Sequence, residues 1–266
     1  MVNIPEIYTI AIKASIEAAS VIMEVYKQDV DTTIKSDGSP VTIADLAASK
    51  IIARHLKQTG IPIIGEEIEK EQFSKRTFWT ENWCVDPLDG TKMFLLKNDE
   101  FSVNIAHVVN EEPVFGIICS PTEKIILIGG PKYGVYTLNF EDIETPEVWK
   151  RIQPKSQLND PLIITCSRNF FHDQETILKE HLNLEPYELS YLRKGSALKF
   201  FDLALGRADV YPRFAPTMEW DIAAGQAIME ALGGTVISTL DTKKLRYNKE
   251  SLFNPYFIAK TKAFLS

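Results

Sequence analysis

Two carboxylates and a flexible turn lie within one short segment, Trp83-Cys84-Val85-Asp86-Pro87-Leu88-Asp89-Gly90-Thr91. The apolar run predicts a strand that ends at Asp86, because Pro87 cannot donate to a strand ladder. Asp86 and Asp89 can point at a common cation, and carboxylate oxygens suit hard ions such as Mg²⁺. The N–H groups of Gly90 and Thr91, at the start of an expected helix, favour a bound phosphate. The segment therefore predicts a metal-assisted phosphate site.

Four further acids occupy positions from which they could reach this segment. Glu66 and Glu67 follow a glycine at the end of an apolar run, as Asp86 follows its own run. Asp221 lies at the start of a predicted apolar helix, and Asp45 lies in the first turn of another predicted helix. Each also has an ordinary interpretation: a solvated pair for the two Glu, a dipole-complementing acid for Asp221 and a helix cap for Asp45. That they meet in the folded chain is a hypothesis.

This hypothesis has an electrostatic consequence. Two unit charges about 4 Å apart repel by roughly 4 kcal/mol at an effective dielectric of 20. Without cations, the pKa values of several carboxyls would rise or the cleft would open, and a phosphate would be repelled. Divalent ions remove both problems, so we expect metal to bind before substrate. The acids concerned are Asp45, Glu66, Glu67, Asp86, Asp89 and Asp221.

The elements that must position these residues alternate in type along the chain. Apolar spacing predicts a helix over residues 4–28, and a second helix begins at Thr42 and ends at Gly60. Four β-rich runs within residues 102–138 predict an antiparallel meander. Strands and helices alternate after residue 161. We expect a layered, mixed α and β fold with an N-terminal α+β lobe (1–145) and a C-terminal α/β lobe (146–266) that completes the site.

The composition is that of a globular chain with an acidic balance. Of 266 residues, 45% are hydrophobic, and the net charge is −7. No nucleic acid polymer is expected as a partner, because that affinity depends on basic residues. Three widely spaced cysteines indicate neither a disulfide framework nor a zinc ribbon. We expect a cytoplasmic protein with no signal peptide, no transmembrane segment and no implied protein partner, and peripheral membrane association stays open.

These motifs resemble the Mg²⁺-dependent, lithium-sensitive phosphatase superfamily that includes the inositol monophosphatases. The resemblance covers nearly the whole chain and depends on three motifs in family order: Gly65-Glu66-Glu67, the block from Asp86 to Thr91, and Trp220-Asp221. Within the superfamily the chain is similar to bacterial CysQ-type 3′(2′),5′-bisphosphate nucleotidases, through the segments 195–200 and 208–217 and Asn254-Pro255. The resemblance implies a five-layered αβαβα sandwich. It also implies removal of the 3′-phosphate of adenosine 3′,5′-bisphosphate (PAP), a reaction of sulfur metabolism.

The resemblance assigns metal ligands residue by residue. Glu66, Asp86 and the Leu88 carbonyl would hold the first Mg²⁺. Asp86, Asp89 and Asp221 would hold the second, with Asp86 bridging the two. Two ions roughly 3.5–4 Å apart can stabilise the attacking and departing oxygens of an in-line displacement by water. We therefore expect two or three Mg²⁺ ions per site and no covalent intermediate.

The resemblance also assigns catalytic and phosphate-binding residues. Thr91, linked to Asp45, would orient and help deprotonate a metal-bound water, and Glu66 is the third catalytic candidate. Glu67 would support these residues or bind a weakly held third ion. The expected phosphate contacts are Asp89, Gly90, Thr91 and Asp221.

One departure from the inositol monophosphatases bears on the substrate. Those enzymes carry a Glu shortly before the Trp-Asp pair that meets inositol hydroxyls, whereas this chain has the aromatic and basic Tyr211-Pro212-Arg213-Phe214. A planar base and a second phosphate suit such residues better than a ring of hydroxyls. Ser196, Lys199 and Arg213 are the candidates for the nucleotide, the last two for its 5′-phosphate. Lys199 could instead extend to solvent from an apolar helix.

Other functions share parts of this pattern. The same chemistry could act on an inositol phosphate or a sugar (bis)phosphate. A non-catalytic protein could bind a phosphate ligand through metal, but such binding has no need of a water-activating pair like Thr91 and Asp45. A Ca²⁺-binding structural protein would show a 12-residue Asp-rich loop, which this sequence lacks.

Overall fold

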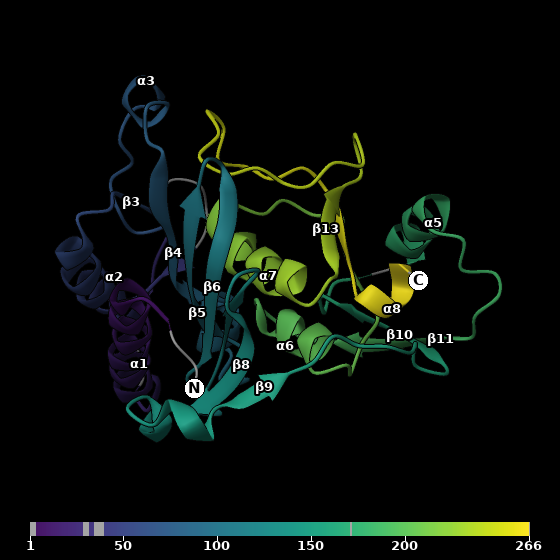
Figure 1. Ribbon diagram of the computed structural model, residues 1–266, viewed down its shortest axis with the longest axis horizontal. Helices are drawn as coiled ribbons and strands as arrows, with labels where there is room; N and C mark the ends of the chain where they lie inside the picture. Colours follow the sequence, from purple (N-terminus) through teal and green to yellow (C-terminus); the bar gives the residue numbers. More distant parts are fainter. Residues whose placement is uncertain (1–3, 29–31, 35–39, 171, 266) are drawn as a thin grey trace.

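The computed structural model describes residues 4–28, 32–34, 40–170 and 172–265. Within these ranges, helices and the two larger β-sheets form layers in the order αβαβα, and the predicted fold class is confirmed. Figure 1 shows the layers edge-on. The outer helices are α1 (Glu6–Tyr26) and α2 (Ile43–Leu56) at one side and α5 (His172–His181) and α8 (Lys262–Leu265) at the other.

The first layer consists of α1 and α2, both predicted from the sequence. α2 begins with a capping box: Thr42 Oγ1 accepts from Ala44 N at 3.1 Å, and Asp45 Oδ2 accepts from Thr42 N at 2.8 Å. After a 3₁₀ turn (Lys57–Thr59), Gly60 ends the helical segment with a φ of 73°. The face of α1 that packs on the sheet is rich in small residues and includes Ala11, Ile12, Ala14, Ala18, Ala19 and Ile22.

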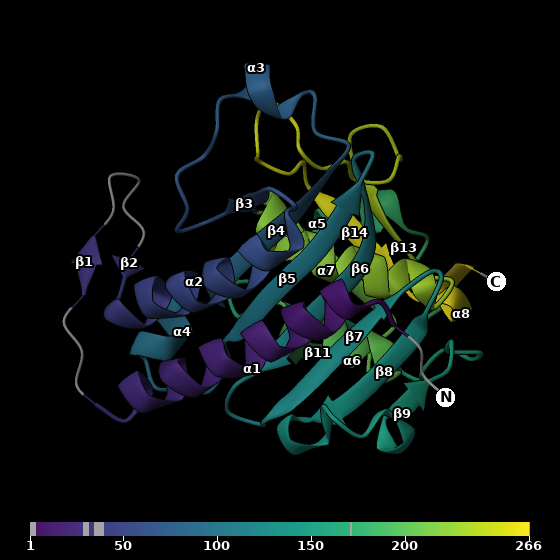
Figure 2. The same ribbon diagram turned by 60° about the vertical axis from the view of Figure 1, so that its left-hand side comes forward.

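The larger sheet has seven strands within the described ranges, in the order β3-β4-β5-β6-β7-β8-β9. β3 is parallel to β4, and all other neighbours are antiparallel, which confirms the meander expected within residues 102–138. Figure 2 shows α1 and α2 crossing this sheet. The strands are β3 (Ile63–Gly65), β4 (Glu81–Asp89), β5 (Ser102–Val109), β6 (Glu112–Ser120), β7 (Ile125–Gly130), β8 (Gly134–Asn139) and β9 (Lys150–Ile152).

The end of β4 differs from the prediction. We expected Pro87 to stop the strand at Asp86, but β4 continues to Asp89. Asp86 lies opposite Asn104 and Asp89 lies opposite Ser102, so β4 carries one extra residue across this interval. Such a bulge leaves a residue outside the ladder, and Pro87 is therefore tolerated within the strand.

The middle layer is formed by α6 (Leu198–Ala204) and α7 (Glu219–Ala231), which lie between the two sheets. α7 packs directly on β6, where a Cβ built on Gly116 would lie 2.1 Å from the Ala224 carbonyl oxygen. Only glycine allows this approach. Since Asp221 is in the first turn of α7, this contact also sets the position of an expected metal ligand.

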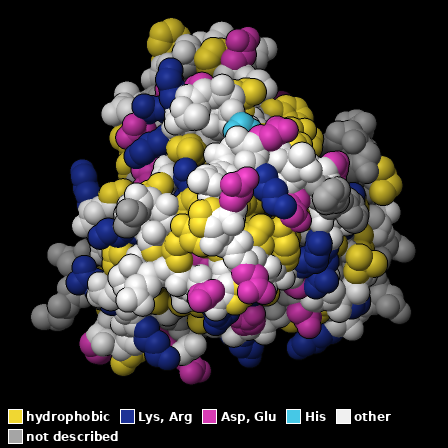
Figure 3. Space-filling view, turned by 90° about the vertical axis from the view of Figure 1, so that its right-hand side faces the viewer, with side chains coloured by type: hydrophobic (Ala, Val, Ile, Leu, Met, Phe, Trp, Pro, Cys, Tyr) yellow, Lys and Arg dark blue, Asp and Glu magenta, His cyan; other side chains and the backbone are white. Residues whose placement is uncertain are grey.

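The smaller sheet has five strands among the described residues, in the order β11-β10-β12-β14-β13. β10 is parallel to β11 and β12, and the other pairs are antiparallel. Apolar residues of α5 pack on its outer face, and Figure 3 shows Lys and Arg scattered among acidic and apolar side chains on this side of the molecule. The strands are β10 (Leu162–Cys166), β11 (Leu189–Arg193), β12 (Val210–Arg213), β13 (Thr235–Ser238) and β14 (Phe257–Lys260).

Short elements complete the chain. They are β1 (Thr33–Ile34), β2 (Pro40–Val41), α3 (Phe73–Arg76), α4 (Thr91–Leu95) and two 3₁₀ turns (Phe140–Asp142 and Pro146–Val148). The division at residue 145 stays a prediction. In the structure β9 pairs with β8 in the larger sheet, and the smaller sheet begins at Leu162.

Candidate active site

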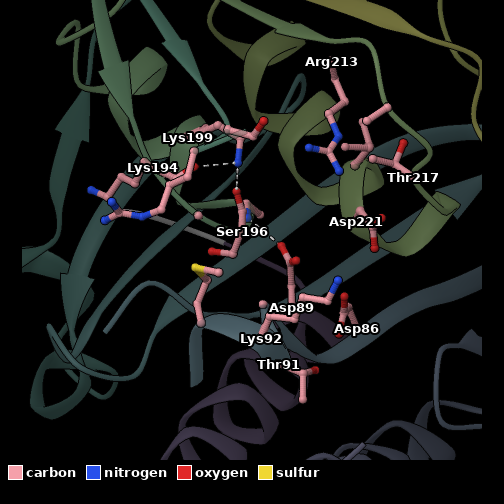
Figure 4. A pocket seen from close by; sticks show the side chains of 18 of the residues that line it. Asp86, Asp89, Thr91, Lys92, Lys194, Ser196, Lys199, Arg213, Thr217 and Asp221 are labelled. Carbon is pink, nitrogen blue, oxygen red and sulfur yellow. Dashed lines mark hydrogen bonds between the residues drawn. The ribbon is translucent and has the colours of Figure 1, made fainter. Parts of the chain in front are cut away.

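Three carboxylates from two distant segments meet at one end of a cavity. Asp86 and Asp89 come from β4 and Asp221 from α7, and one carboxylate oxygen of each lies within 4.8 Å of the others. Figure 4 shows these side chains side by side. The cavity has a volume of about 540 Å³, and Glu66 lines it as well. The hypothesis that acids distant in sequence converge therefore holds for these four residues.

The bulge in β4 explains how Asp86 and Asp89 reach the same cavity. Side chains alternate between the two faces of a regular strand, so residues three apart point to opposite faces. The extra residue between Asp86 and Asp89 restores a common direction. Glu66 reaches the site from the neighbouring strand, because β3 is parallel to β4 and Glu66 N donates to Val85 O at 3.1 Å.

The acidic cluster is electrostatically unfavourable by itself. Burial, followed by the charges of Glu66 and Asp89, raises the pKa of Asp86 well above its usual range. Burial and the charge of Asp89 raise the pKa of Asp221 to about 8. Burial also raises the pKa of Asp89, although the Lys199 ammonium opposes this shift. The expected rise in pKa is confirmed, and a set of hard oxygen donors that repel one another fits a divalent cation.

Thr91 and Asp45 form the expected link. Thr91 Oγ1 donates to Asp45 Oδ1 at 3.0 Å and lies 3.3 Å from the Leu88 carbonyl oxygen. The other Asp45 oxygen, Oδ2, accepts from Thr42 N at 2.8 Å and from Thr42 Oγ1 at 2.6 Å. Asp45 therefore caps α2 and contacts Thr91 at the same time. Burial raises the pKa of Asp45, and the nearby charge of Glu67 adds to the shift.

Two residues that support Asp89 were missed in the sequence. Asn104 Nδ2 donates to Asp89 Oδ2 at 3.2 Å, and Ser102 Oγ donates to Asn104 Oδ1 at 3.0 Å. Both polar residues are fully buried in β5. Two polar side chains at alternating positions near the start of a strand rich in apolar residues were the available signal. Ala197 N also donates to Asp89 Oδ2, at 2.6 Å, and no side-chain pattern could predict that bond.

The three nucleotide candidates all line the same cavity. Ser196 has a φ of 49°, and Figure 4 shows Lys199 and Arg213 on the side of the cavity away from Asp86. Lys199 does not extend to solvent: it is 3% exposed, and its Nζ donates to Lys194 O at 3.2 Å and Ser196 O at 2.6 Å. Burial and the charge of Arg213 lower its pKa to about 8.

The basic side of the cavity is larger than predicted. Arg213 Nη2 donates to Pro216 O at 3.4 Å, and among the described residues its buried Nε has no hydrogen-bond partner. Arg168 and Lys194 also line the cavity, whereas Lys92 lines it beside Asp89 and Thr91, at the acidic end (Figure 4). Arg168 makes two bonds to the Glu100 carboxylate, of 2.8 and 2.5 Å. The cavity thus joins an acidic end to a basic one.

Comparison with known proteins shows which family the chain resembles. Residues 3–261 match the model of the inositol monophosphatase family. The 3′(2′),5′-bisphosphate nucleotidase CysQ of Escherichia coli (strain K12) is 34% identical over 90% of this chain and 94% of that protein. The CysQ protein of Buchnera aphidicola is 39% identical over 82% of this chain and 79% of that protein.

Solved structures agree with the sequence comparison. The crystal structure of CysQ from Bacteroides thetaiotaomicron, described as a bacterial member of the inositol monophosphatase family, is 37% identical with a TM-score of 0.82. The alignment covers 95% of this chain and 96% of that one.

Within the described ranges, none of the helices has the length and apolarity needed to cross a bilayer. By the match over residues 3–261 and the shared fold, the chain belongs to the inositol monophosphatase family.

Proposed function

We propose that this protein removes the 3′-phosphate of adenosine 3′,5′-bisphosphate, giving AMP and phosphate, with Mg²⁺ as its cofactor. The observation that carries the proposal is one cavity with three clustered carboxylates at one end and several basic residues at the other. A nucleotide with two phosphates matches this arrangement, because one phosphate could bind through metal at the acidic end and the other could bind the basic residues. The CysQ relatives, named for activity on such nucleotides, support the choice.

The acidic end would hold two or three Mg²⁺ ions. Glu66, Asp86 and the Leu88 carbonyl would bind one ion, and Asp86, Asp89 and Asp221 would bind a second. When bound, these ions supply positive charge that neutralises the carboxylates and stabilises the reacting phosphate. The buried Asn104 and the Ala197 amide both donate to Asp89 Oδ2, so they fix the carboxylate that a cation would need.

Thr91 and Asp45 would orient the attacking water. The Thr91 hydroxyl donates its proton to Asp45 Oδ1 at 3.0 Å, which leaves the lone pairs of Oγ1 to accept a proton from water. As the water oxygen bonds to phosphorus and the bond from phosphorus to the 3′-oxygen breaks, the water proton would move to Thr91 Oγ1 and the Thr91 proton to Asp45. The leaving 3′-oxygen would take a proton from solvent water. The raised pKa of Asp45 favours that acceptance. Glu66, on the same cavity wall, is the third catalytic candidate, and Glu67 acts through its charge on Asp45.

The phosphate and nucleotide would lie along the cavity. The backbone amides of Gly90 and Thr91 would receive the 3′-phosphate at the start of α4. Ser196, Lys199 and Arg213 would contact the rest of the nucleotide. Two of the three donors of the Lys199 ammonium already bond carbonyl groups, so one donor is left for a ligand.

A phosphate-release assay tests the proposal. With Mg²⁺ present, we expect kcat/KM for PAP to exceed that for inositol 1-phosphate, fructose 1,6-bisphosphate and AMP by at least about 100-fold. EDTA should abolish release from PAP. A larger kcat/KM for the inositol or sugar ester would replace the proposed substrate. Binding of PAP without any turnover would instead indicate the non-catalytic alternative.

A further inference from the structure

We propose that Arg76 is a positioning residue for the metal site. Through hydrogen bonds, Arg76 connects two segments: the loop that contains Glu66 and the start of α7, which contains Asp221. This inference depends on the proposed function in one respect, namely that Glu66 and Asp221 act together on metal. The inference goes beyond that function because it assigns a role to residues outside the cavity, which keep the loop and the start of α7 in fixed relative positions.

The loop concerned joins β3 to β4 and spans residues 66–80. Glu66 is its first residue, and α3, which ends in Arg76, lies near its far end. The loop projects beyond the layers, and Figures 1 and 2 both show α3 beside the C-terminal segment drawn in yellow. A projecting loop needs fixed contacts if its first residue is to hold a constant position.

The far end of the loop is fixed through Arg76, which is only 3% exposed. Its Nη1 donates to Asn248 Oδ1 at 2.7 Å, and both Nη1 and Nη2 donate to Lys249 O at 3.2 Å. Asn248 Nδ2 returns a bond to Arg76 O at 2.8 Å. The guanidinium fork and the Asn amide therefore exchange hydrogen bonds in both directions across the two segments.

The same turn is bonded to the first residue of α7. Glu219 is fully buried, and its carboxylate accepts from Asn248 N at 2.7 Å, from Lys249 N at 3.0 Å and from Lys249 Nζ at 2.5 Å. Glu219 precedes Asp221 by two residues. A continuous set of hydrogen bonds thus runs from Arg76 through the turn to the start of α7.

The near end of the loop contacts the next residue of α7. Lys70 Nζ donates to Glu66 O at 2.5 Å and lies 5.0 Å from the centroid of the Trp220 ring. Three consecutive residues of α7 are therefore involved. Glu219 is linked to the far end of the loop through the turn at Asn248, Trp220 contacts Lys70 near its first residue, and Asp221 belongs to the acidic cluster.

Electrostatic repulsion at the site explains why the loop needs these hydrogen bonds. Glu66 lines the same cavity as Asp86 and Asp221, so these carboxylates repel one another when they are ionised and no cation is bound. Without fixed contacts, this repulsion would move the loop outward. The hydrogen bonds of Arg76 to Asn248 and Lys249 limit that movement. Because coupling between two sites is reciprocal, a bound cation should in turn stabilise these hydrogen bonds.

The test is Mg²⁺ binding to the full-length, metal-free protein, measured by calorimetry without substrate. Arg76→Ala removes the guanidinium, and Asn248→Gly removes the side chain but tolerates the φ of 60° at this position. We expect each variant to weaken Mg²⁺ binding about tenfold, as loss of supporting groups around metal ligands does. Matched controls are Lys75→Ala in α3, which loses an exposed pair with Glu71, and Arg246→Ala, which loses a surface pair with Glu112.

Hydrogen exchange of residues 66–80 provides a second readout on the same samples. Wild type should gain protection on adding Mg²⁺, and the two variants should need about tenfold more Mg²⁺ for the same protection. If Arg76→Ala does not fold, Arg76→Lys, which cannot make the forked bonds, replaces it. Folded variants with wild-type Mg²⁺ affinity overturn the inference but leave the proposed function intact. A wild-type protein that binds no Mg²⁺ overturns the metal site itself.

Discussion

At the scale of single residues, the site is defined by carboxylates that are costly to keep together. Asp86, Asp89 and Asp221 are close enough for shared ligation, and each has a raised pKa. This set of oxygen donors fits the binding of a divalent cation, which would neutralise their repulsion. Thr91 has a different proposed role, in which its hydrogen bond to Asp45 would serve to move a proton.

Thr91→Ala should separate chemistry from metal binding. Loss of the hydroxyl removes the group that would relay the water proton, so kcat for PAP should fall by about 100-fold or more. Mg²⁺ affinity should change little, because the proposed ligands stay in place. Thr91→Ser keeps the hydroxyl and serves as the matched control. Loss of Mg²⁺ binding in Thr91→Ala would contradict the role given to this residue.

The raised carboxyl pKa values predict a pH-dependent stability of the metal-free protein. A group whose folded pKa lies above its unfolded value stabilises the fold at low pH, and this stabilisation is lost as pH rises through the folded pKa. For Asp221 that pKa is about 8. In EDTA, Tm should therefore fall as pH rises from the unfolded pKa, about 4, to about 8 and level off above that, and Mg²⁺ should restore it.

Asp221→Asn removes the charge responsible for this effect. In EDTA at pH 9 its Tm should exceed that of wild type by roughly 5 °C, since each kcal/mol shifts Tm by about 2–4 °C in a chain of this size. Differential scanning calorimetry of both proteins at pH 6 and pH 9 provides the measurement. Equal melting temperatures at pH 9 would mean that the cluster does not destabilise the metal-free fold.

At the scale of elements, local patterns predicted helices and strands better than their ends. The helices over α1 and α2 and the meander from β5 to β8 depend on local spacing and were found as expected. The continuation of β4 past Asp86 depends on pairing with Asn104 and Ser102, which are far away in sequence. The same holds for Arg76, whose burial depends on a turn at Asn248.

Gly116 connects the packing of an element to the site. Since a Cβ there would overlap the Ala224 carbonyl, Gly116→Ala should push α7 away from β6. We expect a loss of about 1–3 kcal/mol in the free energy of unfolding, measured by urea denaturation, as for other overpacked cores. Mg²⁺ affinity should weaken too, because α7 carries Asp221. Unchanged unfolding and unchanged binding would show that α7 does not need this close approach.

At the scale of the whole molecule, the site exists only where two neighbouring layers bring together segments that are far apart in sequence. The larger sheet supplies Asp86 and Asp89, and α7 in the middle layer supplies Asp221. Family motifs predicted that these residues belong together, whereas composition and periodicity alone gave only a layered α and β class. The division at residue 145, the cytoplasmic location and the lack of a protein partner stay predictions, because they depend on more than this one fold.

Binding of divalent cations by Asp86, Asp89 and Asp221 can be observed in a crystal structure with Mn²⁺ in place of Mg²⁺, through the anomalous scattering of the ion. We expect anomalous peaks at about 2.0–2.4 Å from the carboxylate oxygens of these residues. Asp221→Asn crystals should lose at least one peak. An active enzyme whose Mn²⁺ peaks all lie away from these carboxylates would show that they do not bind the metal.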